Sequence, residues 1–194
     1  VRTTAQSLEQ KMIEEEEVRE AVRKLLEHVG EDPTREGLHD TPKRVAKAWR
    51  EMTSGYAMDA AEALGTTFDV KFDELIILRG IRFTSMCEHH CLPFQGTATV
   101  GYIPGDRVVG LSKLARVVDV FSKRLQVQER MTEQIAHAVF DHVDARGVGV
   151  VIRAHHSCMG CRGVKQQDAM MTTSCMLGIL KDDPTARGEL LALE

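Results

Sequence analysis

Apolar residues near the start of the chain recur at the spacing of a helix. They do so from Leu8 to Val29, and Gly30 then supplies a stop signal. A second helix is predicted from Thr41-Pro42, which has the form of an N-cap followed by proline at the first helical position. This helix is expected to stop near Gly55, so that residues 1–55 form a helical segment.

The pattern becomes typical of strands after Phe72. The predicted strands are 75–78, 81–83, 94–102, 148–154 and 164–176, and the clearest period-two alternation lies in 94–102. Two amphipathic helices are predicted over 111–125 and 131–139, and a short helix runs from Asp183-Pro184 to Leu193. Strands that flank a helix pair indicate an α+β fold, with the helices on one face of an antiparallel sheet. We therefore expect a helical segment over 1–72 and a separate domain over 73–194.

Composition narrows the classes of function. The 194 residues are 43% hydrophobic, enough for one good-sized core, and 25 basic against 29 acidic residues give a net charge of -4. This balance does not favour non-specific nucleic-acid binding. No apolar run approaches the ~20 residues that span a bilayer. The polar segment 1–20 does not resemble a secretion signal, and its acidic run Glu14–Glu17 is interpreted as a solvated helix face. The cytoplasm is the expected location.

Cysteine and histidine gather in two short stretches, 87–91 and 155–161. These hold all the cysteines except Cys175, and four of the eight histidines. Cys87 and His90 are three residues apart and can face the same way, and their sulfur and nitrogen donors suit zinc. Cys158 can supply a third ligand, which leaves a position open for chemistry. Alternatively, Cys161 completes a closed Cys3His structural site. Cys91 and Cys175 are expected to be small buried residues.

Five motifs resemble those of the GTP cyclohydrolase I family. They are Ser85–His90 (SMCEHH), Gly110–Arg116 (GLSKLAR), Gln126–Arg130 (QVQER), His156–Cys158 followed by Arg162-Gly163, and Gly30–Leu38 followed by Asp40–Ala46. The resemblance implies conversion of GTP and water to 7,8-dihydroneopterin triphosphate and formate, at the start of pterin and folate synthesis. It places Zn2+ on Cys87, His90 and Cys158, and it gives Cys161 no ligand role.

The resemblance also implies roles in catalysis for three residues. His156 and His89 exchange protons beside the metal, and Ser112 joins His156 in the later ribose rearrangement. Histidine suits this task because its unperturbed pKa is about 6.5. Two plainer interpretations stay open: His89 orients a metal ligand, and Ser112 is a helix N-cap.

Substrate contacts follow from the same resemblance. Guanine is expected to pair with the carboxylate of Glu129, with Gln128 beside it. The triphosphate is expected to bind Ser112, Lys113 and Arg116 at a helix start, where backbone N–H groups and the helix dipole favour anions. Arg162 adds a guanidinium, and Arg44 is expected from a neighbouring subunit.

The fold that the resemblance implies is the tunnelling fold. This is a four-stranded antiparallel sheet with two helices, assembled into a homodecameric ring with sites at subunit interfaces. Two rival functions are a different enzyme of the same fold, such as a pterin synthase or a nitrile reductase, and a non-catalytic zinc module closed by Cys161. The pairing of His89 and His90 with Glu129 argues against the former. The sequence does not say whether a regulatory protein binds.

Overall fold

The structure is a computed structural model that describes the backbone from Leu8 and the side chains from Glu15 onward. The first seven residues of the predicted helical segment lie outside the described residues. The chain forms two compact units, one up to Glu51 and one from Met52 to Glu194. The expected domain boundary between residues 72 and 73 stays a prediction.

The first unit consists of α1 (Leu8–His28) and α2 (Thr41–Met52). Both helices were predicted, and Gly30 follows α1 with a φ of 83°, in the left-handed region that favours glycine. In the acidic run, Glu16 and Glu17 are exposed as expected, whereas Glu15 is half-buried and pairs with Arg19 and Arg50.

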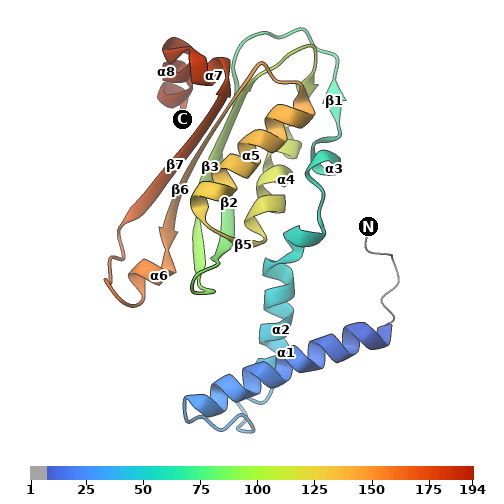
Figure 1. Cartoon of the computed structure of the whole chain (residues 1–194), viewed down its shortest axis with the longest axis vertical. Coiled ribbons are helices and arrows are strands. Elements are labelled where there is room, and N and C mark those ends of the chain that lie inside the picture. Colours follow the sequence, from blue (N-terminus) through green and yellow to red (C-terminus); the bar gives the residue numbers. More distant parts are fainter. Residues whose placement is uncertain (1–7) are drawn as a thin grey trace. The chain divides into compact units, whose positions relative to one another are not determined.

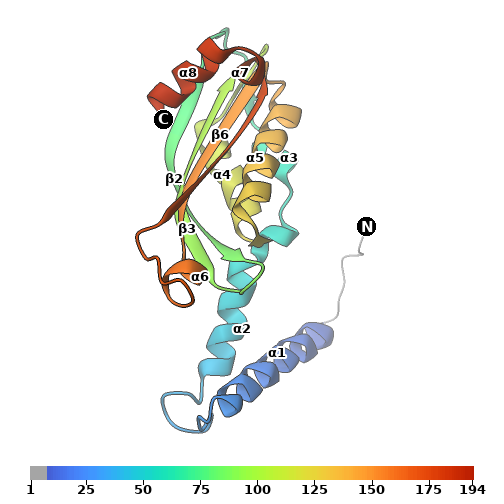
Figure 2. The same ribbon diagram turned by 60° about the vertical axis from the view of Figure 1, so that its left-hand side comes forward.

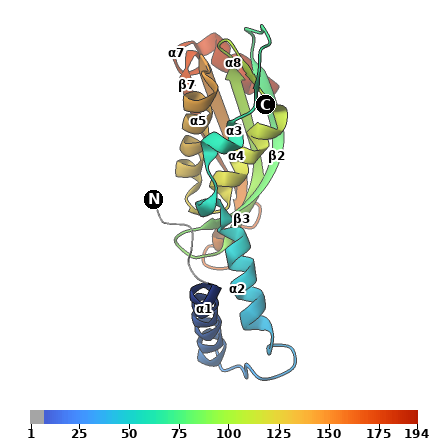
Figure 3. The ribbon, with the colours of Figure 1, turned by 90° about the vertical axis from the view of Figure 1, so that its right-hand side faces the viewer.

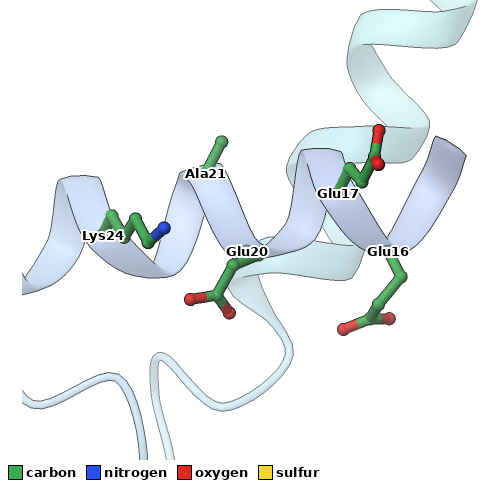
Figure 4. A pocket seen from close by; sticks show the side chains of 5 residues that line it. All are labelled: Glu16, Glu17, Glu20, Ala21 and Lys24. Atoms are coloured by element: carbon green, nitrogen blue, oxygen red, sulfur yellow. The ribbon is translucent and has the colours of Figure 1, made fainter. Parts of the chain in front are cut away.

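A shallow hollow runs along α1 and is lined by Glu16, Glu17, Glu20, Ala21 and Lys24. Their side chains point in different directions around the helix (Figure 4). A ligand site needs polar groups that converge on one point. The hollow therefore has the character of a solvated helix surface.

The second unit is built on a five-stranded sheet in the order β5-β2-β3-β6-β7 (Figure 1). Its four long strands are antiparallel neighbours, and the short β5 pairs in parallel with β2. The predicted four-stranded sheet thus has one additional strand. The strands are β2 (Ile76–Cys87), β3 (Pro93–Ile103), β5 (Leu125–Gln126), β6 (Gly147–His156) and β7 (Met170–Gly178), and the separate pair β1 (Thr67–Phe68) and β4 (Val108–Val109).

Helices cover both faces of this sheet (Figure 2). On one face, α4 (Leu111–Ser122) and α5 (Gln128–Val143) pack on the sheet and enclose the main core, and α3 (Ala60–Leu64) packs against α4 and α5 (Figure 3). On the opposite face, Leu180 of α7 (Ile179–Asp182) and Leu190 of α8 (Pro184–Leu193) bury Ile103 and Val151. The predicted pair of helices on one face is confirmed, and α7 and α8 are an addition on the other.

The alternation predicted for 94–102 is present in β3. Phe94, Ala98, Val100 and Tyr102 are fully buried; Gln95 and Thr97 between them are exposed, whereas Thr99 and Gly101 are buried because both faces of the sheet are covered there. Gly96 lies so close to β6 that a Cβ there would come within 1.8 Å of the Arg153 carbonyl oxygen. Only glycine allows β3 and β6 to approach this closely at this point.

Several predicted boundaries were wrong. The strands predicted at 75–78 and 81–83 are one strand, β2, with a bulge at Gly80, whose φ is 72°. Helix α4 ends at Ser122, so Leu125 lies in β5 instead. The strand predicted from residue 164 begins at Met170. Gly110 is the N-cap of α4, so the N-cap interpretation of Ser112 was also wrong.

The second predicted helix stops earlier than expected. It ends at Met52, and a 3-10 turn, η1 (Ser54–Ala57), occupies the rest of the predicted range. Among residues 8–194, the structure contains no helix that is both long and apolar enough to cross a membrane.

Candidate active site

Two strands on either side of β3 end at the same place. Met86, near the end of β2, pairs with Pro93, and His156, at the end of β6, pairs with Phe94. The segments that follow both strands, including the short helix α6 (Ser157–Gly160), therefore lie at one end of the sheet (Figure 1). This arrangement brings together the two cysteine- and histidine-rich stretches.

A tight turn after β2 presents the first pair of candidate ligands. The Cys91 N–H donates to the Cys87 carbonyl oxygen at 2.8 Å, and the Cys87 N–H donates to the Leu92 carbonyl oxygen at 2.9 Å. Cys91 has a φ of 53°, which closes the turn in a conformation that few residues other than glycine adopt. Cys91 is exposed, so its expected burial was wrong.

Cys87, His90 and Cys158 form a compact cluster. One ligand atom from each lies within 4.8 Å of the others, and the Cys87 Sγ is 3.9 Å from the His90 Nδ1. Ligands around a tetrahedral zinc are about 3.5–3.8 Å apart, given zinc–sulfur and zinc–nitrogen bonds of about 2.3 and 2.0 Å. The observed separations, 3.9 Å and at most 4.8 Å, are somewhat longer, so the two sulfurs and the imidazole nitrogen would move slightly closer together around a zinc ion. Burial, together with the nearby Cys87 sulfur, raises the pKa of the metal-free Cys158 thiol.

Within the described residues, this cluster does not include Cys161. Cys161 caps the end of α6 and is exposed to solvent. The arrangement therefore favours the open three-ligand site over the closed Cys3His alternative. Cys175 is half-buried against the core, and burial raises the pKa of its thiol.

The turn that carries the ligands is fixed to the start of α5. Glu88 forms an ion pair with Arg130, which lowers the pKa of the Glu88 carboxyl group. Arg130 also donates from Nε to the Gln126 Oε1 at 3.1 Å, and the Glu88 N–H donates to the Gln126 carbonyl oxygen at 3.0 Å. Gln126 is itself buried, so the turn rests on a fixed polar support.

Two histidines flank the cluster. The His89 Nδ1 lies 3.9 Å from the Cys87 Sγ. The His156 ring stacks on Phe94 with centroids 4.6 Å apart and planes within 4°, and its Nε2 is 2.9 Å from the Gln128 Oε1. Burial lowers the pKa of His156, and the Glu129 carboxylate acts in the opposite direction.

The family comparison decides the identity of this arrangement. The model of the GTP cyclohydrolase I family matches residues 18–194, which include every motif described above. The chain belongs to the GTP cyclohydrolase I family. The family is one of hydrolases, and the resemblance inferred from the motifs is confirmed.

Curated relatives agree with this assignment over most of their length. "GTP cyclohydrolase 1 2" of Pseudomonas putida is 53% identical over 170 residues, covering 87% of this chain and 91% of the relative. "GTP cyclohydrolase 1" of Bifidobacterium longum is 51% identical over 181 residues, covering 93% and 90%. The apo crystal structure of an archaeosine synthase QueF-Like protein is a looser match, with a TM-score of 0.47, 18% identity, and coverage of 56% of this chain and 97% of that one.

Of the other predicted site residues of this GTP cyclohydrolase I family member, some lie near the cluster and others belong to other parts of the chain. Glu129, exposed in the first turn of α5, lies beside Gln128 and close enough to act on the charge of His156. Arg162 follows α6 and is close enough to influence Cys158 electrostatically. Arg44 belongs to α2 in the first unit, where it pairs with Asp40 at 3.4 Å.

The three residues at the start of α4 are remote from the cluster in the same chain. Helix α4 runs toward β5, which pairs with the Cys87 end of β2, so Ser112 lies at the opposite end of the helix. The ten positions from Ser112 to Ser122 correspond to about 15 Å along the helix axis. Lys113 and Arg116 share this location near Ser112, within about 6 Å along the axis.

Three supporting residues were not identified from the sequence as parts of the site. They are Phe94 beneath His156, and Gln126 and Arg130 behind the ligand turn. Gln126 and Arg130 are in the QVQER motif, which was a usable signal. The sequence identifies Phe94 only as a core residue, because no neighbouring residue indicates that it stacks on His156.

Proposed function

We propose that this chain converts GTP and water to 7,8-dihydroneopterin triphosphate and formate, the entry step to pterin and folate synthesis. The observation that carries the proposal is the Cys87–His90–Cys158 cluster, with ligand atoms within 4.8 Å of one another. His156 precedes Cys158 by two positions, at the same end of the sheet. The three clustered residues would hold one Zn2+. When bound, zinc would supply Lewis acidity, which lowers the pKa of a water ligand to about 7.

Proton transfer is assigned to His156 and His89. Addition of water at C8 of guanine places negative charge on the ring unless N7 receives a proton at the same time. A histidine held close to the metal ligands is suited to deliver and recover this proton. The stacking of His156 on buried Phe94 supports the assignment, because it fixes the plane of the ring. Ser112 is assigned to the later steps, in which the ribose opens and closes onto the freed amine.

Guanine recognition is assigned to Glu129. Its carboxylate can accept hydrogen bonds from the N1–H and the 2-amino group of guanine, which adenine does not offer in this arrangement. The exposure of Glu129 at the start of α5, next to His156, supports this role. Gln128 is buried immediately before it and is considered separately below.

The triphosphate is assigned to residues from two chains. Arg162 near Cys158 comes from the same chain as the zinc ligands. Ser112, Lys113 and Arg116 are assigned to a neighbouring copy, because within one chain they lie about 15, 14 and 9 Å along α4 from the end of the helix that is nearer the metal ligands. Arg44 is likewise assigned to a neighbour. A homodecamer with sites at subunit interfaces accommodates all of these roles.

Direct assay tests the reaction. Purified, zinc-loaded protein incubated with GTP is expected to release formate and to yield a fluorescent pterin after oxidation and dephosphorylation. Formate and pterin should appear in equal amounts, because each turnover releases one carbon from one guanine. Removal of zinc by a chelator should abolish both products, and added zinc should restore them. Undiminished turnover by verified metal-free protein would contradict the metal-dependent proposal.

Subunit mixing tests the shared site. Lys113→Ala and His156→Ala are each expected to be inactive, but co-expression in mixed oligomers should recover about a quarter of the sites if the two residues come from different chains. Different affinity tags on the two variants allow mixed oligomers to be purified in two steps. Mixed oligomers that stay as inactive as either parent would show that the two residues serve the same site from one chain.

A further inference from the structure

Gln128 is a buried polar residue at the start of α5. Its exposed fraction is 1%, whereas its neighbour Glu129 is exposed. A buried amide is costly unless its hydrogen-bonding groups are paired. The partners of Gln128 therefore indicate what its side chain does.

The amide group of Gln128 has only one chemically consistent orientation. Its Nε2 lies 3.1 Å from the Ile152 carbonyl oxygen and 3.1 Å from the Met171 carbonyl oxygen. It is also 3.1 Å from the Thr173 Oγ1. Backbone carbonyl oxygens only accept hydrogen bonds, so the NH2 group must face them. The Oε1 atom is then directed to the other side, toward His156.

This orientation determines the hydrogen on His156. The Gln128 Oε1 lies 2.9 Å from the His156 Nε2 and can only accept a hydrogen bond. Nε2 must therefore donate, which leaves Nδ1 as the ring nitrogen that is free to exchange a proton. If the hydrogen were on Nδ1 instead, the Nε2 lone pair and the Gln128 Oε1 would be two acceptors facing each other at 2.9 Å.

The His156 ring is held on two sides. Phe94 lies parallel to its face, with planes within 4°, and is itself fully buried. Gln128 holds its edge at Nε2. Stacking alone would allow the ring to rotate in its own plane, and the hydrogen bond removes that freedom.

We propose that Gln128 is a positioning residue that fixes the rotation and tautomer of His156, so that Nδ1 is the atom presented to the substrate. The proposal rests on the proposed function for the assignment of His156 to proton transfer. It replaces the substrate contact that the family resemblance implied for Gln128, because the amide is buried and its hydrogen-bonding groups are occupied within the chain.

The decisive variant is Gln128→Met, which keeps a similar volume but removes both amide groups. The turnover number kcat for GTP is expected to fall by about 10- to 100-fold, because a misplaced proton donor slows chemistry. The KM for GTP should stay within about threefold, because no substrate contact is lost. A KM raised tenfold with unchanged kcat, or no change in either constant, would overturn the proposal.

Gln134→Met is the matched control. Gln134 lies further along α5, and its Oε1 accepts a hydrogen bond from the Gln126 Nε2 at 2.9 Å. This variant also loses a glutamine hydrogen bond in the same helix, but the bond is to Gln126 behind the ligand turn, so the His156 ring should keep its stack on Phe94. Thermal unfolding of the two variants separates loss of stability from loss of positioning. Loss of the His156–Phe94 stack in both variants would indicate general damage and would overturn the proposal.

A crystal structure of the Gln128→Met oligomer provides a test that does not depend on activity. The His156 ring is expected to rotate or to leave its parallel stack on Phe94. An unmoved ring would overturn the positioning role. If the wild-type protein does not convert GTP, the proposed function fails, while this structural comparison still decides whether Gln128 holds His156.

Discussion

Replacing Cys158 with alanine is expected to remove the metal and to lower GTP turnover by on the order of a thousandfold. Cys158 is the only one of the three clustered ligands that comes from the second cysteine-rich stretch. Its loss would leave Cys87 and His90, two ligands on one turn, which is fewer than the three that catalytic zinc sites use. Zinc per chain, measured by mass spectrometry, and formate release from GTP should fall together.

Cys161→Ala is the matched control for this variant. Cys161 lies three positions further along, just after α6, and is exposed outside the cluster. We expect it to keep one zinc per chain and full turnover. Loss of zinc in Cys161→Ala would support a closed four-ligand site instead. Full metal content and full turnover in Cys158→Ala would refute the assignment of Cys158 as a ligand.

Replacing Glu129 with glutamine is expected to lower kcat/KM for GTP by about 10- to 100-fold. In the proposed complex the Glu129 carboxylate accepts two hydrogen bonds from guanine, whereas a glutamine amide could accept only one and would turn a donor toward the other guanine donor. The preference for GTP over ATP should fall correspondingly. Steady-state kinetics with both nucleotides measure this preference directly.

Glu133→Gln controls for charge on the same helix. Glu133 is exposed one turn further along α5, so the same substitution removes the same charge without reaching the proposed guanine contact. Its kinetics with both nucleotides should match those of the wild-type protein. An unchanged GTP preference in Glu129→Gln would remove the guanine-binding role from this residue.

The sequence predicted the features that depend on local periodicity. The alternation around Ala98 and Val100 identified β3, and the amphipathic stripes identified α4 and α5, because each pattern repeats over a full element. Strand β5 was missed because two residues are too few to show a period. The bulge at Gly80 was interpreted as a break between two strands, because a glycine can mark either a bulge or the end of a strand.

Some residues of the candidate site could likewise be predicted from the sequence, and others could not. The short spacing from Cys87 to His90 indicated ligands on one turn, and the second cysteine-rich stretch offered Cys158 as a third. The resemblance to a known family then favoured Cys158 without Cys161. The role of Gln128 did not follow from the sequence, because a glutamine at the start of a helix resembles a solvent-facing residue. Its partners at Ile152 and Thr173 are 24 and 45 positions away, and only the folded sheet brings them together.

The stacking of His156 on Phe94 limits which substitutions this protein can accept during evolution. Phe94 is wholly buried and also meets Phe83 edge-on, with ring centroids 5.9 Å apart. The proposed proton donor therefore rests on the same close-packed interior that keeps the sheet folded. Substitutions that repack this core would therefore alter both the catalytic rate and the stability of the fold. Changes of substrate specificity can arise more easily at exposed positions such as Glu129, where a substitution leaves the packing of the core unchanged.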